Sequence, residues 1–356
     1  MLDQRVQTLG QAGKSTVLYE TPDGTRLLLL PYGARVLGLF APQDGDNFYW
    51  SNPALENVDA ARALFASAGW HNTGGDRTWL APELDTFYPD ARLDRYVQPR
   101  QLDMSDYAVE RAAGGTTLSK RMTLHLARPD RDVDLRLAKW LGPAPNPLRC
   151  ERGMGEILGS VNYAGYTQRT TLELVGRSAG AAAEVGIWNL IQLPPGGELL
   201  VPTYARAEPQ HYFGDIPPEF FTIEDRLLRL RVGFRASHKI ALRATAVCGR
   251  AGYVYPQGDR WSLVIRSFFV NPSGRYVDVR KSDPDDLGYA LQVCRVDEPE
   301  FGSFFELEYH APALGSPPDP GRSEDVSQVW AFRGRRDAIA AVAQRLLGAD
   351  PGFRGE

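Results

Sequence analysis

The sequence predicts an all-β protein built as a large antiparallel sandwich or barrel. Most of the chain consists of short segments in which apolar and polar residues alternate, which is the periodicity of a strand with one buried face. Turn-forming segments such as PDGT, LPPGGE and NPSGR separate them, and the 356 residues include 35 Gly and 26 Pro. No regular alternation of strands with helices and no internal repeat is visible, so a parallel α/β fold and a solenoid are both excluded.

The expected strands follow one another along the chain with their alternation intact. In RLLRLRVGF, for example, Leu228, Leu230 and Val232 lie on one face, and Arg229 and Arg231 lie on the other. In chain order the strand segments are TRLLLLPYG (25–33), ARVLGLFAP (34–42), SKRMTLHLA (119–127), RDVDLRLAKWL (131–141), TTLELVG (170–176), VGIWNLIQL (185–193), ELLVPTY (198–204), RLLRLRVGF (226–234), KIALRATAV (239–247), RWSLVIRSFFV (260–270), YALQVCRV (289–296), FFELEYHAP (304–312) and SQVWAFRG (327–334).

Two segments have the 3.6-residue period of a helix. Residues 335–347 place Ile339 and Leu346 on one apolar stripe, and Gly348 follows as the C-terminal stop. Residues 58–67, VDAARALFAS, predict a second helix. The first of these is expected as a short C-terminal helix on the β fold.

Bulk properties narrow the class of protein. A net charge of -4 and the lack of Lys/Arg runs argue against a nucleic-acid partner, and no apolar run is long enough to span a bilayer. Cys150, Cys248 and Cys294 are far apart, which predicts reduced, buried thiols. The N-terminal residues show no signal-peptide pattern, so we expect a cytoplasmic protein. We also expect a monomer or homodimer. Residues 1–356 should form one domain, with its core at about 15–334.

The segment GWHNTGGDRTWLAPE, residues 69–83, concentrates groups that suit a ligand site. Adjacent glycines let the backbone adopt positive φ or approach a ligand closely. Arg77 offers a planar donor fork, and the tryptophans offer flat faces of the kind that stack on sugar rings. The alternative is a Gly-rich turn with an Arg77–Glu83 ion pair and both tryptophans in the core. The candidate binding residues are Trp70, Asn72, Asp76, Arg77, Trp79 and Glu83, and His71 is a candidate catalytic residue.

A second group of candidates lies near the C-terminus. In FFELEYHAP, the residues Glu306, Glu308 and His310 share one strand face, with apolar residues behind. Crowded carboxyls have raised pKa values, which is how a general base is tuned. A solvated outer face explains the same pattern without any function. In VGIWNLIQL, Asn189 and Gln192 add hydrogen-bonding groups.

No cofactor or dedicated metal site is expected. The five histidines show no HxH or HExxH spacing, and the cysteines show no CxxC pair. His71, Glu308 and His310 could form a metal site only if the fold brought them together.

In this order the segments resemble the galactose mutarotase-like (aldose 1-epimerase-like) superfamily. LLLLPYGARVLGLFAP resembles its opening strands, and GGDRTWLAPE resembles the Gly-Gly segment that glucose-6-phosphate-epimerase-like members use at the substrate cleft. FFELEYHAP resembles the C-terminal strand that carries the glutamate base. The match covers residues 15 to 334 and is closest to an uncharacterised branch with a GGDRxWxAPE segment. The resemblance implies a large β-supersandwich.

The resemblance also implies a reaction. In mutarotases a glutamate accepts the anomeric hydroxyl proton, a histidine protonates the ring oxygen, and the opened ring closes on either face. Glu308 matches the base, with Glu306 as the register alternative, and Arg77 matches a ligand of the sugar hydroxyls. FYPDARLDRY and GIWNLIQL stand where the family's histidines are expected, so His71 or His310 would have to replace the acid.

The function expected from the sequence is therefore binding of a small carbohydrate, with Glu308 acting as the base of an aldose 1-epimerase. Two alternatives remain: a non-catalytic sugar-binding or sensor protein, and a lyase or hydrolase acting on a modified sugar. All three require Arg77 and Glu308 to open into the same cavity.

Overall fold

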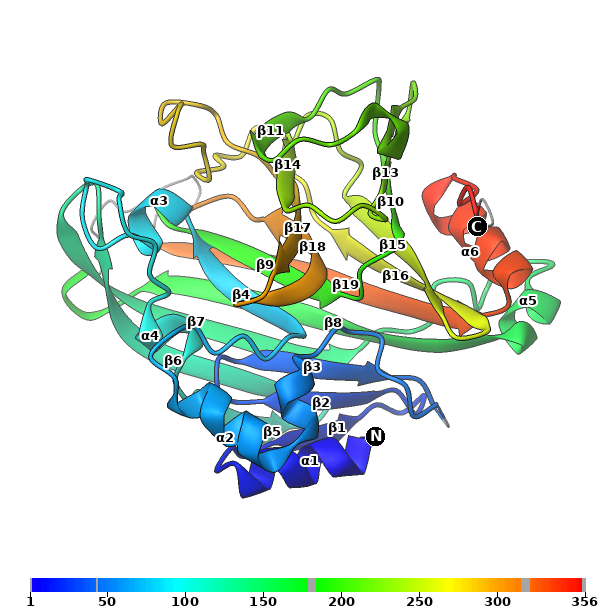
Figure 1. Ribbon diagram of the computed structural model, residues 1–356, viewed down its shortest axis with the longest axis horizontal. Coiled ribbons are helices and arrows are strands. Elements are labelled where there is room, and N and C mark those ends of the chain that lie inside the picture. The colour runs from blue at the N-terminus through cyan, green and yellow to red at the C-terminus, as the bar shows by residue number, and fades with distance from the viewer. Residues whose placement is uncertain (1, 43, 179–183, 315–320, 354–356) are drawn as a thin grey trace.

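The computed structural model describes residues 2–42, 44–178, 184–314 and 321–353. In this part of the chain the strands form two large sheets, and every pairing between neighbouring strands is antiparallel (Figure 1). The predicted fold class, all-β with two large antiparallel sheets and a short C-terminal helix, is confirmed.

The first sheet has nine strands. In spatial order they are β1 (Val17–Glu20), β2 (Arg26–Leu30), β3 (Arg35–Phe40), β4 (Asp76–Ala81), β9 (Gly186–Leu193), β18 (Gly302–His310), β17 (Leu291–Glu298), β14 (His238–Leu242) and β11 (Gln210–Phe213).

The second sheet has ten strands. In spatial order they are β12 (Phe221–Ile223), β13 (Leu227–Arg231), β10 (Glu198–Pro202), β15 (Arg250–Gln257), β16 (Arg260–Phe268), β19 (Arg322–Gly334), β8 (Val161–Leu174), β7 (Arg131–Pro143), β6 (Gly115–Leu126) and β5 (Ala108–Ala112).

Short helices surround the sheets. They are α1 (Leu2–Gln11), α2 (Val58–Ala66), α3 (Glu83–Thr86), α4 (Arg100–Asp103), α5 (Gly155–Ser160) and α6 (Arg336–Leu347), with 3₁₀ turns η1 (Pro53–Glu56), η2 (Gly176–Ser178) and η3 (Pro218–Phe220). Helix α6 packs on β15 and β16, whereas α1 and α2 lie together at the N-terminal end of the molecule (Figure 1). Among the described residues, no helix has both the length and the apolar character needed to cross a bilayer.

Both predicted helices are present. Helix α6 ends at Gly348, which adopts the left-handed conformation at φ 67° and ψ 20°, as expected of a glycine stop. Helix α2 is capped by Asn57, whose side chain accepts hydrogen bonds from the amides of Asp59 and Ala60. Helix α1 was not predicted. Its buried residues are Leu2, Thr8 and Leu9, and its sequence is polar on average.

The central strands β4, β9 and β18 pair in a fixed register. Leu190 lies opposite Arg77 on one side and opposite Glu308 on the other, so these three residues form one row across the sheet. The next row of the same face contains Trp79, Trp188 and His310. Because successive strand residues point to opposite faces, these rows define an outer face of the sheet, and the residues between them define an inner face.

The inner face meets the second sheet through a polar network as well as apolar packing. Asp76 accepts hydrogen bonds from Lys139 (2.7 Å) and Arg266 (2.5 Å), and from the Tyr166 hydroxyl (2.5 Å), and all four residues are buried. Although burial opposes ionisation, the charges of Lys139 and Arg266 hold the pKa of Asp76 below its usual value. These contacts tie β4 to β7, β8 and β16 of the other sheet.

The thiols depart in part from the expectation that all three are buried. Cys294 is buried, but Cys150 is exposed and Cys248 is half-buried. All three are free cysteines, as predicted. Cys150 follows a sequence of turns after β7 rather than a strand, which explains its exposure.

Candidate functional site

The outer face of the nine-stranded sheet carries a cavity of about 540 Å³. This volume lies in the range of about 300–1,000 Å³ that is typical of small-molecule sites. Strands β4, β9, β18, β17 and β14 supply its floor. The lining residues are Trp70, Arg77, Trp79, Glu83, Leu84, Tyr88, Tyr96, Gln98, Trp188, Tyr212, Phe213, Lys239, Val279, Arg280, Lys281, Ser282, Cys294, Val296, Phe301, Phe304, Glu306 and Glu308.

Glu308 lies at the floor of this cavity and is 1% exposed. Its Oε2 accepts a hydrogen bond from the indole Nε1 of Trp188 at 2.9 Å and lies 3.4 Å from the ammonium nitrogen of Lys239. Its Oε1 is buried and has no hydrogen-bond partner among the described residues. Burial raises the pKa of Glu308 to about 7, because removal of water outweighs the opposing attraction of Lys239. The carboxyl therefore exchanges its proton near neutral pH.

Glu306 is two residues away on the same face of β18 but has different partners. Its Oε1 accepts hydrogen bonds from Arg77 at 2.7 Å and from the side-chain amide of Gln192 at 2.9 Å. The guanidinium of Arg77 stacks over the ring of Trp79, with 4.0 Å between its central carbon and the ring centroid. The Nε and Nη1 atoms of Arg77 are buried without a hydrogen-bond partner in the described structure. Arg77 thus fixes Glu306 and retains donors for a ligand.

Lys239 connects two carboxyl groups. Besides Glu308, its ammonium lies 3.7 Å from Oε2 of Glu83, which extends into the cavity from the start of α3. Burial disfavours the ammonium, but the carboxylates of Glu308 and Glu83 raise the pKa of Lys239 above its usual value. Burial also raises the pKa of Glu83, against the effect of Lys239. Lys239 therefore stays charged while one of its two partners can carry a proton.

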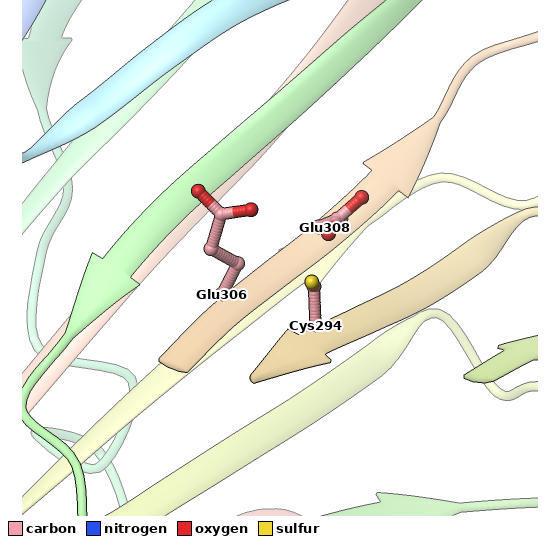
Figure 2. A group of neighbouring side chains, drawn as sticks. All are labelled: Cys294, Glu306 and Glu308. Atoms are coloured by element: carbon pink, nitrogen blue, oxygen red, sulfur yellow. The ribbon is translucent and has the colours of Figure 1, made fainter. Parts of the chain in front are cut away.

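Cys294, Glu306 and Glu308 form a cluster at the centre of the floor. Figure 2 shows Cys294 on β17 and the two glutamates on β18, and one donor atom from each residue lies within 4.8 Å of the others. Burial and the neighbouring carboxylates raise the pKa of Cys294 well above its usual value, so it is a thiol rather than a thiolate ligand. Lys239 and Arg77 already neutralise the glutamates, so a cation fits these residues poorly.

Aromatic rings make up most of the remaining wall. Trp70 and Trp79 lie 5.3 Å apart, and Trp188 meets Trp79 edge-on at 5.4 Å, so the three indoles form one continuous surface. Tyr96 and Phe213 are 39% and 48% exposed at the mouth of the cavity. Apolar faces next to buried charged groups are suited to a ligand that has both C–H faces and hydroxyl groups.

Glu306, Glu308 and Arg77, which were predicted from separate segments, lie at one place in the structure. Arg77 and Glu308, more than two hundred positions apart, line the same cavity. The ion pair of Arg77 is with Glu306, so the alternative Arg77–Glu83 pair of an isolated turn is wrong. The solvated-face alternative is also wrong, because Glu306, Glu308 and His310 are 6%, 1% and 1% exposed.

Two predicted binding residues lie on the inner face instead. Asp76 is paired with Lys139 and Arg266 between the sheets. Asn189 accepts a hydrogen bond from Thr78 at 2.6 Å and donates one to the Tyr309 hydroxyl at 2.7 Å, also between the sheets. Both are separated from the cavity by their own strands, so the prediction that they contact the ligand does not agree with their position.

The remaining four predicted residues also lie off the cavity wall. Gln192 is buried and supports Glu306 through its 2.9 Å hydrogen bond. His71 is buried against Tyr32, with 2.7 Å between Nδ1 and the hydroxyl oxygen, and its Nε2 lies 2.9 Å from the Ser67 carbonyl oxygen. His310 stacks under Trp188 at 5.3 Å, and burial lowers its pKa to about 4. Asn72 donates to the Phe301 carbonyl and supports a segment of the wall. Neither histidine lines the cavity, and the hypothetical metal site of His71, Glu308 and His310 is not assembled.

Sequence reasoning missed Lys239, Tyr96 and Cys294. Lys239 opens KIALRATAV and has the appearance of a polar residue at a strand end. Its pairing opposite Cys294, in the row of Glu306 and Gln192, gives it a buried position on the outer face. Only the order of strands across the sheet reveals this, since β14, β17 and β18 are distant from β4 in sequence.

Fold and cavity together define a β-sandwich protein with an aromatic cavity that contains paired charges and has the size of small-molecule sites. The chain belongs to a family described as "Family of unknown function (DUF6786)", whose model matches residues 2–351. No curated protein matches the sequence.

Similar solved structures have galactose mutarotase-like folds. One is a GalM/aldose epimerase homologue from C. elegans, with 10% identity, a TM-score of 0.40, and coverage of 90% of this chain and 99% of that chain. Another is a galactose mutarotase-like protein from Clostridium acetobutylicum, with 11% identity, a TM-score of 0.41, and coverage of 89% and 94%. Any inference about function therefore depends on the side chains of the cavity.

Proposed function

We propose that the cavity binds a carbohydrate and that Glu308 acts on it as a general base in the exchange of anomers, an aldose 1-epimerase reaction. The observation that carries this proposal is the buried, unpartnered Oε1 of Glu308 at the floor of an aromatic cavity. A buried acceptor without a partner costs free energy, and a ligand hydroxyl group would supply the missing hydrogen bond.

The surroundings of Glu308 support a sugar as this ligand. The half-buried Trp70 and the exposed rings of Tyr96 and Phe213 match the C–H faces of a pyranose ring. The Arg77 donors that have no partner among the described residues match its hydroxyl groups. Trp188 and Lys239 hold the carboxyl of Glu308 in place, which preorganises the base.

The pKa of Glu308, raised to about 7, suits a group that both accepts and returns a proton at neutral pH. Glu308 would accept the proton of the anomeric hydroxyl while the bond from C1 to the ring oxygen breaks and the ring oxygen takes a proton from a second group of the cavity. Rotation of the aldehyde and ring closure reverse both proton transfers and give the other anomer. This reaction consumes no second substrate and needs no net change in the protein.

Saturation-transfer NMR of D-glucose and D-galactose tests this proposal, because it measures exchange between the anomers directly. We expect exchange faster than in buffer, and a loss of about 10²–10⁴-fold in Glu308→Gln. Glu110→Gln, an exposed carboxyl on β5 of the other sheet, is the matched control. Rates equal to buffer across a panel of aldoses would remove the epimerase reaction.

A non-catalytic sugar-binding protein is the second candidate. The position of both histidines outside the cavity favours it, since the acid that the family resemblance implies has no histidine here. Calorimetry with the same sugars separates the candidates: binding without accelerated exchange supports the sensor, and absence of binding to any glycan contradicts both.

A further inference from the structure

An anomer exchange at this site needs a second group that carries a proton. When the anomeric hydroxyl loses its proton to Glu308, the ring oxygen must gain one as its bond to C1 breaks. His71 is held by Tyr32, and His310 lies under Trp188, so neither imidazole supplies it. The acid has to come from another residue that lines the cavity.

We propose that Glu83 is this second proton-carrying group, and that it works with Glu308 across the ammonium of Lys239. The inference rests on the proposed function. Glu83 and Glu308 both line the cavity, and their Oε2 atoms lie 3.7 Å and 3.4 Å from the same nitrogen. The two carboxyls therefore cannot be further apart than the sum of these distances, which lets one sugar ring contact both.

The two carboxyls approach from different elements. Glu83 follows β4 at the start of α3, where its amide donates to Oδ1 of Asp278 at 2.8 Å, whereas Glu308 rises from β18. The tether to Asp278 fixes the backbone of Glu83 and leaves its side chain in the cavity, where it is about a quarter exposed. Glu83 can therefore meet a ligand that Glu308 contacts from the floor.

The charges around Glu83 leave it able to hold and release a proton. Burial raises the pKa of Glu83 above its usual value; Asp278 and Glu306 act in the same direction, while Lys239 and the Tyr96 hydroxyl oppose them. Tyr88 and Tyr212 are further titratable neighbours that line the cavity. Burial and Glu83 raise the pKa of Tyr88, and burial, Asp278 and Glu83 are among the causes that raise the pKa of Tyr212.

Other protonated groups of the wall are poorer acids. Burial and nearby carboxylates raise the pKa values of Tyr96 and Cys294 well above their usual values, so both hold their protons too firmly. Lys239 is held in its charged form by the carboxylates. Glu83 combines access to the cavity with a carboxyl whose pKa is raised above its usual value.

The step balances with these two residues. The proton of the anomeric hydroxyl passes to the Glu308 carboxylate, the O–H electron pair forms the carbonyl bond, and the bond from C1 to the ring oxygen breaks. The ring oxygen takes the proton of Glu83. After rotation about the bond from C1 to C2, the reverse transfers close the ring as the other anomer. Both carboxyls then regain their starting states, and Lys239 remains charged throughout.

The test compares Glu83→Gln with Asp85→Asn in the full-length protein, using exchange of D-glucose and D-galactose anomers. Asp85 lies on the same short helix but pairs with Arg128 outside the cavity, at 2.6 Å. We expect Glu83→Gln to lower kcat by about 10²-fold or more, with KM within about threefold of the parent. The bell-shaped pH profile should lose one limb. Formate should partly restore the rate of Glu83→Ala.

The outcomes separate the two proposals. Wild-type exchange no faster than buffer overturns both. Exchange that depends on Glu308 but survives in Glu83→Gln, with both pH limbs intact, overturns the role of Glu83 alone. An equal loss in Asp85→Asn assigns the effect to the fold of α3 and also overturns it. Thermal unfolding of each variant shows whether it is folded.

Discussion

The ammonium of Lys239 controls the protonation of Glu308, and its removal gives a prediction that needs no substrate. In Lys239→Met the positive charge 3.4 Å from Oε2 of Glu308 is lost. Because this charge favours the carboxylate, the pKa of Glu308, now about 7, should rise. The variant also leaves Glu83 without its cation, so the two carboxyls should compete for protons at higher pH.

The size of the shift follows from the distance. Two unit charges 3.4 Å apart interact by about 5 kcal/mol at an effective dielectric constant of about 20. At about 1.4 kcal/mol per unit, this energy corresponds to a pKa shift of about three to four units. Water that enters the cavity and relaxation of the side chains reduce the effect, so we expect a rise of about 1–3 units.

Carbon NMR of protein labelled at the glutamate carboxyl carbon is the assay, with the Glu308 resonance assigned by its loss in Glu308→Gln. Lys120→Met is the matched control, since it removes one positive charge from β6 of the other sheet. A Glu308 pKa that falls, or stays within about half a unit of the parent value, would refute the electrostatic account. An equal rise in Lys120→Met would attribute the shift to net charge.

Three further predictions concern stability, and denaturant unfolding tests each. Arg77→Met should lower the free energy of unfolding by about 3–5 kcal/mol because it leaves Glu306 buried without a cation. Adding Glu306→Gln should recover most of this loss, and an unchanged unfolding midpoint in the single variant would contradict the prediction. Gly74→Ala should be more destabilising than Gly196→Ala. Both glycines have φ near +90°, but only a Cβ at Gly74 would meet backbone, at 2.4 Å from the Trp50 carbonyl oxygen. Equal losses would show that the strain of a positive φ alone matters. The pKa of Glu308 is higher in the folded than in the unfolded state, so its contribution to stability is present below about pH 4.5. This contribution, up to about 3 kcal/mol, is lost as pH rises to about 7. In Glu308→Gln the free energy of unfolding should lack this decrease between about pH 5 and 7.

The alternation of residues in single strands allowed much of the fold to be predicted. In β13, Leu228 and Leu230 are buried, and Arg229 is more exposed, as the period of two requires. The same rule placed Glu306 and Glu308 on one face. Applied to Asp76 and Arg77, which are adjacent, the same rule places the two side chains on opposite faces, yet both are predicted from the sequence as ligand-binding residues. The structure shows that only Arg77 opens into the cavity.

Contacts between distant segments could not be derived in the same way. Lys239 is buried beside Glu308 because β14 lies next to β17, and this strand order is not encoded in the local pattern of either segment. His71 follows Trp70 in sequence, but Tyr32 from an earlier strand connection holds its ring away from the cavity. The local sequence predicts on which face of a strand a residue lies, whereas the residue opposite it on the next strand depends on how the sheet is assembled.

The polar network between the sheets has a practical consequence for engineering this protein. In each central strand, alternate residues face either the cavity or the other sheet. A library that randomises Trp79 and Trp188 therefore changes the wall of the cavity, while Arg77 keeps its ion pair with Glu306 and the pairs between the sheets stay intact. The intervening positions Asp76 and Asn189 should be kept constant, since a substitution there would disturb the attachment of one sheet to the other. Selectivity can thus be evolved on one side of a strand without sacrificing the scaffold on its reverse.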